Sequence, residues 1–152
     1  MRAFLTGYAR AVGALGVGLL FASLFTDDRW RDQPLAIGVL LIAVLFMRIQ
    51  QIPLTKYGAL NLLSMPAVAG ALVAGAPASA LALWSGVFVA DVLILKKGME
   101  IAWINAGREV IALIAAYGIF SWASVLMAAE LTKLNAETLP ALALLEIGRA
   151  HV

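Results

Sequence analysis

Long apolar stretches alternate with short polar segments along the whole chain. Five of these stretches are predicted to be complete transmembrane helices, at about residues 11–25, 34–47, 59–74, 78–95 and 101–129, and a sixth helix begins at Leu139. A helix that crosses the roughly 30 Å hydrocarbon core of a bilayer needs about 20 apolar residues. The first two stretches are shorter, so they must recruit flanking residues or lie in locally thinned lipid. The pattern predicts an all-α polytopic membrane protein.

Proline and glycine indicate where the predicted helices break. The sequence Gly75-Ala76-Pro77 lies between the third and fourth stretches, and a tight turn is expected there because proline suits the first turn of a helix. Segment 48–58 contains Pro53, so it cannot be a continuous helix and is expected to be extended or interfacial. Three residues would also permit a broken start of the third helix: Asn61, Ser64 and Pro66.

The composition excludes several classes of protein and of site. Apolar residues make up 63% of the chain and charged residues 13%, so a soluble domain could not cover its apolar surface with polar side chains. The formal net charge of +2 is too small to indicate nucleic-acid binding. The chain has no cysteine, no phosphate-binding glycine loop, no metal-ligand cluster and no nucleophile–base pair. We therefore expect no catalytic site, metal or cofactor in these residues.

Lysine and arginine are distributed unevenly between the connecting segments. The amino end, segment 48–58 and segment 96–100 each contain two lysine or arginine residues. Of the segments between them, 27–32 contains two arginines and three aspartates, 75–77 contains no lysine or arginine, and 130–137 contains one lysine. Short cytoplasmic loops are enriched in these cations. The amino terminus and both basic segments of this multi-pass protein are therefore predicted to face the cytoplasm.

The last six residues interrupt the sixth apolar stretch. The sequence Ile147-Gly148-Arg149-Ala150-His151-Val152 corresponds to one reading frame of a common sequencing adapter. We interpret residues 147–152 as a non-native tail and residues 1–146 as a transmembrane fragment of a longer protein. The only histidine, His151, then takes no part in chemistry. The alternative is a natural short tail after an amphipathic helix.

Small residues recur at a spacing of four in the first and third stretches. The pairs are Gly7/Ala11, Ala14/Gly18, Ala67/Ala71 and Gly70/Ala74. This spacing lets the backbones of two membrane helices approach closely. Ordinary packing inside one bundle and a homodimer formed through these faces both explain the pattern, and the sequence leaves both open.

Four polar side chains interrupt the apolar stretches, namely Asp91 in the fourth and Asn105, Arg108 and Glu109 in the fifth. Charges at membrane depth are costly and are usually paired. If the two helices are antiparallel neighbours, Asp91 and Arg108 lie at similar depth. We therefore predict an Asp91–Arg108 ion pair with Glu109 as a second partner. The cluster is interpreted as a structural ion pair, a ligand or ion site, or a signalling switch.

The order of motifs in residues 50–130 resembles a bacterial family. The motifs are Ile52-Pro53-Leu54, Leu60-Asn61-Leu62, Gly75-Ala76-Pro77, Asp91-Val92-Leu93 and Trp103-Ile104-Asn105-Ala106-Gly107. They are similar to those of multi-span, MASE-like sensor regions at the amino terminus of signalling proteins. The resemblance implies a non-enzymatic membrane input domain that precedes a cytoplasmic HD-GYP phosphodiesterase or GGDEF cyclase domain of cyclic-di-GMP signalling. It leaves the ligand or stimulus open.

A second resemblance concerns transport. The number of segments, the short first spans and the small residues of the first helix are similar to substrate-binding S-components of energy-coupling factor importers, which have six spans. A vitamin pocket would need several polar groups on the extracellular half. The polar residues here are predicted to lie on the cytoplasmic half, which favours the sensor interpretation.

The orientation can be tested with single cysteines, because the chain has none of its own. In intact cells, a cysteine in Asp28→Cys should react with a membrane-impermeant thiol reagent, whereas a cysteine in Lys97→Cys should not. Labelling at position 97 without labelling at position 28 would overturn the predicted orientation.

Overall fold

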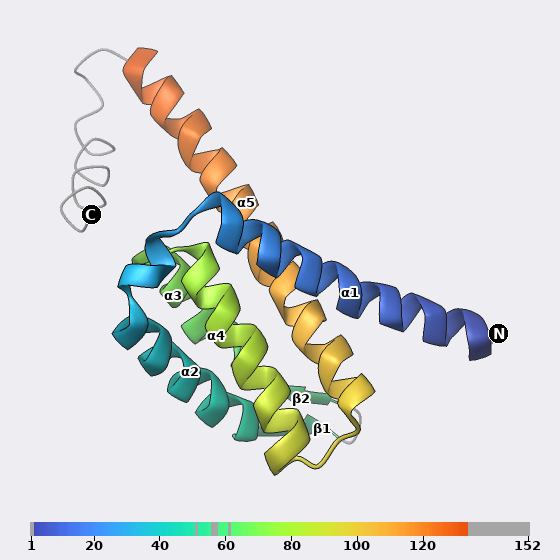
Figure 1. The fold of residues 1–152 in the computed structure, drawn as a ribbon. Helices are drawn as coiled ribbons and strands as arrows, with labels where there is room; N and C mark the ends of the chain where they lie inside the picture. The colour runs from blue at the N-terminus through green and yellow to red at the C-terminus, as the bar shows by residue number, and fades with distance from the viewer. Residues whose placement is uncertain (1, 51, 56–57, 61, 134–152) are drawn as a thin grey trace. The chain divides into compact units, whose positions relative to one another are not determined.

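A computed structural model describes residues 2–50, 52–55, 58–60 and 62–133. These residues contain five α-helices: α1 (Arg2–Thr26), α2 (Pro34–Ile49), α3 (Ser64–Ala74), α4 (Ala76–Val89) and α5 (Met99–Lys133) (Figure 1). Two shorter helical elements are the 3-10 helix η1 (Arg29–Asp32), between α1 and α2, and the π-helical turn η2 (Ala90–Ile94), which continues α4. Two strands, β1 (Ile52–Thr55) and β2 (Gly58–Leu60), lie between α2 and α3.

Three of these helices are long and apolar enough to cross a membrane. The apolar segments are Thr6–Thr26 in α1, Ala76–Ile94 in α4 and η2, and Met99–Met127 in α5. Helices α2 and α3 contain only 16 and 11 residues, fewer than the roughly 20 needed to cross the hydrocarbon core. The structure thus confirms the helical architecture and three segments of spanning length, where the sequence predicted five. The predicted sixth helix and the tail at 147–152 lie outside the described residues.

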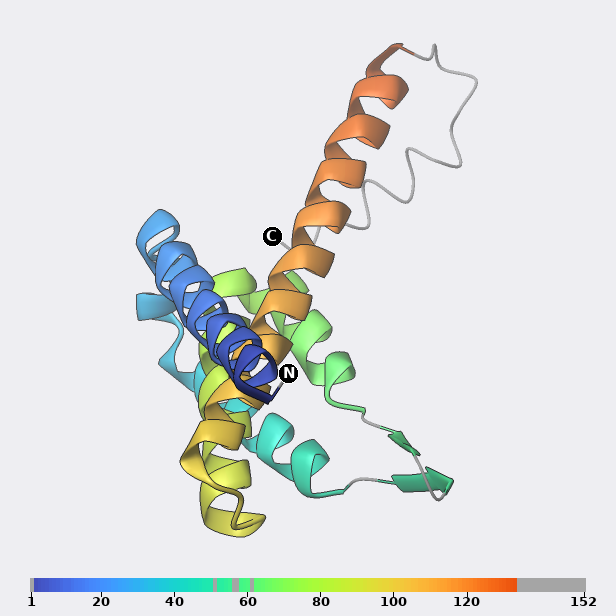
Figure 2. The ribbon, with the colours of Figure 1, turned by 90° about the vertical axis from the view of Figure 1, so that its right-hand side faces the viewer.

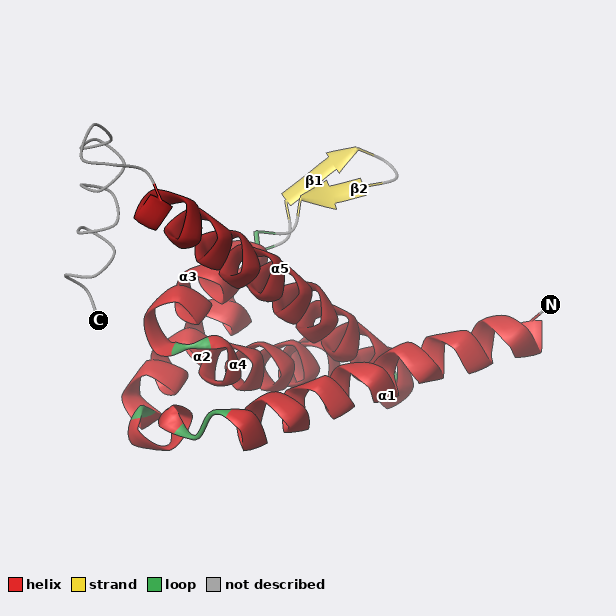
Figure 3. Cartoon of the chain, turned by 90° about the horizontal axis from the view of Figure 1, so that it is seen from above, coloured by secondary structure: helices red, strands yellow, loops and turns green. Residues whose placement is uncertain are grey.

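The third predicted span, residues 59–74, is wrong at its start. The chain forms β2 up to Leu60, and α3 begins only at Ser64. Strands β1 and β2 pair antiparallel, with Ile52 opposite Leu60 and Pro53 opposite Ala59 (Figure 3). Pro53 ends any helical continuation of α2, and proline is tolerated in a two-stranded ribbon because both strands are edges. Within segment 48–58, Ile52–Thr55 is extended, which is one of the two conformations predicted for this segment.

A single glycine joins α3 to α4. Gly75 has a φ of +88° and a ψ of 155°, a conformation that is readily open only to glycine. Pro77 lies in the first turn of α4, where its missing N–H costs no hydrogen bond. The hydroxyl of Ser79 donates a 2.5 Å hydrogen bond to the carbonyl of Ala67 on α3. The predicted tight turn at 75–77 is confirmed.

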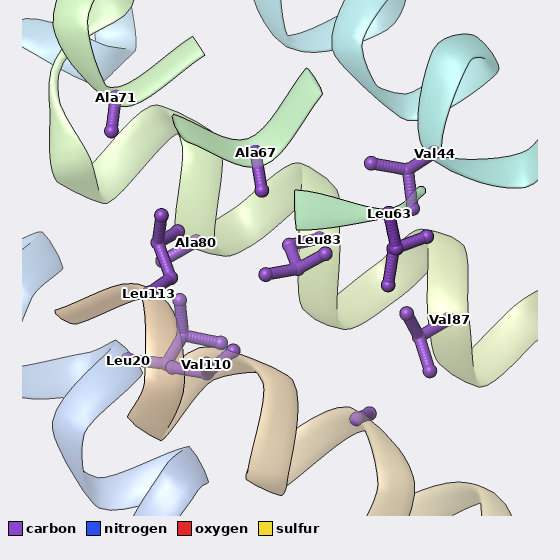
Figure 4. Packing of buried hydrophobic residues seen from close by; sticks show 11 residues of the cluster. Leu20, Val44, Leu63, Ala67, Ala71, Ala80, Leu83, Val87, Val110 and Leu113 are labelled. Carbon is purple, nitrogen blue, oxygen red and sulfur yellow. The ribbon is translucent and has the colours of Figure 1, made fainter. Parts of the chain in front are cut away.

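The chain divides into two compact units, Met1–Tyr117 and Gly118–Val152. In the second unit, the described residues are the last part of α5. In the first unit α4 is central, since 56% of its apolar segment is buried, against 17% for α1. Figure 4 shows Leu20 of α1, Val44 of α2, Leu83 of α4 and Val110 of α5 among the side chains of this core. Close packing around α4 is possible because alanine occupies many of its buried positions: Ala78, Ala80 and Ala82 are fully buried.

The outer faces of the helices carry large apolar side chains. Phe25, Leu35 and Val73 are more than four-fifths exposed, at 83%, 83% and 86%. A monomeric soluble protein rarely exposes so many apolar side chains together. Lipid removes the cost of such exposure, so the packing as well as the composition indicates association with a membrane.

Helices α1 and α5 cross at glycines. A Cβ atom on Gly16 would collide with the backbone of Gly107, and one on Gly107 would lie 2.8 Å from the Cα and carbonyl oxygen of Gly13. The two backbones are therefore in direct contact, as small residues allow in membrane helices. Figure 2 shows α1 and α5 side by side at this crossing.

The small-residue pairs predicted from the sequence fall into two groups. On α3, Ala67, Gly70, Ala71 and Ala74 are all buried, so they serve packing inside the bundle. On α1, the four residues of the predicted pairs, Gly7, Ala11, Ala14 and Gly18, are exposed. A Cβ atom on Gly7 or Gly18 would meet nothing within 4 Å. The predicted homodimer through such faces stays a prediction.

The contact between α1 and α5 at the glycines predicts that alanine substitutions at two nearby positions of α1 differ sharply in their effect on stability. Gly16→Ala should lower the stability of the purified protein by about 1–3 kcal/mol, because the added methyl group forces the two backbones apart. Gly18→Ala, two residues away in the same helix, is the matched control and should leave the melting temperature in detergent unchanged or slightly raised. Equal melting temperatures for the two variants would show that α1 and α5 are not in contact.

Candidate functional site

Asp91 lies in the π-helical turn at the end of α4, and it is completely buried. The turn is closed by a 2.9 Å hydrogen bond from the N–H of Leu95 to the carbonyl of Ala90, five residues earlier. The N–H of Lys97 then donates to the carbonyl of Asp91 at 2.8 Å, and Lys96 takes a left-handed φ of 51°. Single π-helical turns are rare and occur frequently at functional sites.

Four N–H donors converge on the Asp91 carboxylate. Arg48 binds it through one edge of its guanidinium group, with Nε donating to Oδ1 at 2.9 Å and Nη2 to Oδ2 at 2.8 Å. The amide of Asn105 donates to Oδ2 at 2.6 Å, and the Lys97 ammonium group donates to Oδ1 at 3.1 Å. We call Asp91, Arg48, Lys97 and Asn105 the Asp91 cluster.

The Asp91 cluster joins three helices at one end of the first unit. Arg48 lies in the last turn of α2, Lys97 in the connection before α5, and Asn105 in the second turn of α5. Helix α2 approaches α4 closely because Gly86 has no side chain: a Cβ atom there would lie 3.1 Å from the Cβ of Val44. Val44 and Arg48 are four residues apart, so the packing that buries Val44 also directs Arg48 towards Asp91.

The negative charge of the Asp91 carboxylate is balanced by cations of the same cluster. Arg48 is 3% exposed and pairs bidentately, which is the strongest geometry for a guanidinium–carboxylate bond. The Lys97 side chain is 33% exposed, so it is the less buried of the two cations that contact Asp91. Compensation of this kind is required because a buried charge without a partner is strongly destabilising.

Of the four residues predicted to form a polar cluster, the structure brings Asp91 and Asn105 together, and the predicted Asp91–Arg108 pair is wrong. Arg108 bonds instead to Glu109, at 2.9 Å from Nη2 to Oε1, and its side chain is 63% exposed. The reason is rotation about the axis of α5: Ala102 and Ala106 face the core and are fully buried, whereas Arg108 points away from it.

Arg48 and Lys97 are the two members of the Asp91 cluster that the sequence analysis does not identify as site residues. The second apolar stretch is predicted to end at residue 47, which leaves Arg48 in a connecting segment, but α2 continues to Ile49. The spacing of Arg48 from Val44 was the available signal, since it places the arginine on the buried stripe of α2.

A groove of about 220 Å³ lies beside Glu109, between the start of α3, α4 and α5. Its lining residues are mainly apolar: Leu63, Ser64, Ala67, Val68, Leu83, Glu109, Ala112, Leu113 and Ala116. Glu109 is the charged residue among them, and its side chain is 19% exposed. Within the residues that the structure describes, no group of three or more histidine or acidic side chains could hold a metal ion.

Two further ion pairs involve α1 or the residues after it. Arg10, in the third turn of α1, binds Glu100 near the start of α5 at 2.6 Å. After the end of α1, Arg29 binds Asp27 at 2.8 Å, and this hydrogen-bonded pairing lowers the pKa of the Asp27 carboxyl group from its ordinary value. Asp27 and Arg29 lie just beyond the apolar segment of α1, as expected for charges near a membrane surface.

No family model, curated protein or solved structure matches this chain. The resemblances to MASE-like sensor regions and to importer S-components therefore stay predictions.

The pairing in the Asp91 cluster can be tested by a double-mutant cycle on melting temperature in detergent. Arg48→Ala and Asp91→Ala should each destabilise the protein by about 3–5 kcal/mol, because each leaves a buried charge without its main partner. The double variant should recover part of this loss. Arg108→Ala is the control, and its effect should be additive with that of Asp91→Ala, because Arg108 bonds to Glu109 and not to Asp91. Coupling of Asp91 to Arg108 and not to Arg48 would contradict the structure.

The contacts of Lys97 and Gly98 indicate a better position for the single-cysteine test of orientation. Lys97 contacts Asp91, so replacing it disturbs the cluster. A Cβ atom on Gly98 would meet nothing within 4 Å, which makes Gly98→Cys the better partner for Asp28→Cys.

Proposed function

We propose that this chain is the membrane-embedded input domain of a bacterial signalling protein, and that the Asp91 cluster changes state when the stimulus is received. The observation that carries the proposal is the convergence of α2, η2 and α5 on one buried carboxylate. A signalling domain needs an element with discrete alternative arrangements. A network of two cations and one amide around a single buried carboxylate is such an element, because it can lose one donor and still keep Asp91 paired.

The cluster contains contacts that differ in how readily they can break. Lys97 is the partly exposed member, while Arg48 is almost fully buried. Loss of the Lys97 contact would leave the carboxylate bound to Arg48 and Asn105, so the network can loosen without stranding Asp91. Asn105 lies on α5, a continuous helix of 35 residues. A shift of α5 at Asn105 would therefore move the part of this helix that belongs to the first unit, up to Tyr117.

In this proposal the protein lies in the bacterial inner membrane with its amino terminus in the cytoplasm. Helices α2 and α3 also cross, as short spans in thinned lipid or with flanking residues. The Asp91 cluster then lies near the cytoplasmic face. A sixth span would lead to a cytoplasmic cyclase or phosphodiesterase domain acting on cyclic-di-GMP.

The alternative is a substrate-binding membrane subunit of a small-molecule importer. One observation favours it: the small-residue face of α1, from Gly7 to Gly18, is exposed and could receive another membrane protein. Against it, the polar side chains of the Asp91 cluster bond to one another, and the groove beside Glu109 is lined mainly by apolar residues.

The test starts from the complete reading frame in the source genome. If the frame encodes a GGDEF or HD-GYP domain, the turnover of cyclic-di-GMP by the full-length protein can be measured in membranes. Asn105→Ala removes one donor from Asp91 without removing a charge, and it should change turnover by about fivefold or more in either direction.

Arg29→Gln is the matched control, because it removes a polar contact of an exposed residue remote from the cluster. It should leave turnover unchanged. A stop codon soon after the sixth span would favour the importer subunit, and equal turnover in both variants would remove the Asp91 cluster from the signalling mechanism.

A further inference from the structure

Arg108 is an exposed cation in the apolar segment of α5. Its side chain is 63% exposed, and among the described residues its ion-pair partner is the adjacent Glu109. One hydrogen bond between them uses one of the five N–H donors of the guanidinium group. The second carboxylate oxygen of Glu109 receives no bond from the described residues.

The depth of this pair makes its exposure costly. Glu100, which pairs with Arg10, lies near the start of the apolar segment of α5. Arg108 follows Glu100 by eight residues, about 12 Å of rise along a helix at about 1.5 Å per residue. Charged side chains at such depth face the interior of a protein or an aqueous cavity and pair with one another. A neighbouring membrane helix with a matching anion and cation would satisfy the remaining bonding capacity of Arg108 and Glu109.

The surface beside the pair is shaped for a close helix contact. Ala112 and Ala116 follow on the same side of α5 and border the 220 Å³ groove with Val68 of α3. Both alanines are exposed. Small side chains let a second membrane helix approach the backbone closely, so van der Waals packing and interhelical hydrogen bonds can stabilise the contact.

We infer that this face of α5 binds a second copy of the chain, with Arg108 of each copy paired to Glu109 of the other. Two copies with the same orientation in a bilayer are related by a twofold axis along the membrane normal, so equivalent residues lie at equal depth. A cation and an anion at adjacent positions are self-complementary under this symmetry, because the contact from 108 to 109 occurs twice. The inference depends on α5 alone and does not rest on the proposed signalling function.

The contact can be detected by cross-linking in native membranes, since the parent chain has no cysteine. Ala112→Cys should give a disulfide-linked dimer on mild oxidation. Ala14→Cys, on the exposed face of α1, is the matched control and should give none. A dimer through position 14 without one through position 112 would overturn the inference and favour the small-residue face of α1.

Charge exchange tests the pairing itself. In the Ala112→Cys background, Arg108→Glu and Glu109→Arg should each lower cross-linking about tenfold, since like charges then face each other. Co-expression of these two variants, with tags of different size, should restore the mixed dimer selectively, because both contacts are again between opposite charges. An ion pair that stays inside each copy gives no preference for the mixed dimer, and that result would overturn the inference.

A variant that does not fold is recognised by the loss of its melting transition. In that case Arg108→Gln and Glu109→Gln replace the charge reversals, and both should still lower cross-linking through position 112. Unchanged cross-linking in both would mean that a lipid or a small ligand, and not a second copy, neutralises the pair.

Discussion

The buried carboxylate of Asp91 is the constraint on which the arrangement of this chain depends. A carboxylate without partners in an apolar interior would cost several kcal/mol, so it must be held by donors from the elements around it. The donors come from Arg48 on α2, Lys97 in the turn after η2, and Asn105 on α5. Because these elements are distant in sequence, satisfying one charge fixes the relative positions of three helices.

Close packing of backbones makes this charge network possible. Gly86 allows Val44 against α4, which brings the end of α2 to Asp91. At the other side of the bundle, Gly16 and Gly107 let α1 contact α5 directly. In lipid, helices gain little from burying apolar side chains, so short-range packing and polar contacts decide which helices are neighbours. The small residues and the polar cluster thus act together to set which helices are neighbours.

The π-helical turn after α4 is a local feature that depends on tertiary contacts. The additional residue of the turn shifts the residues that follow Asp91, and the left-handed Lys96 then reverses the chain so that Lys97 returns to the carboxylate. A local irregularity of this kind is maintained only where the surrounding contacts stabilise it, and here the four donors to Asp91 do so.

Much of the local structure could be predicted from the order of residues alone. The apolar stretches predict helices, Gly75 and Pro77 predict the turn between α3 and α4, and Asp91 and Asn105 stand out because charged and amide groups are rare in such stretches. These features depend on backbone sterics and on hydration, which act on each segment by itself. The extended segment at Pro53 was predicted for the same reason, but its pairing with residues 58–60 shortened α3.

The tertiary structure alone decided which cation neutralises Asp91. Sequence spacing places Arg108 at a suitable depth, yet it does not give the rotation of α5, which turns Arg108 outwards and Asn105 inwards. Nor does it show that α2 packs against α4 closely enough for Arg48 to reach the carboxylate. An ion pair depends on distances between side chains of different helices, and those distances are set by how the helices pack, which no single segment of the sequence specifies.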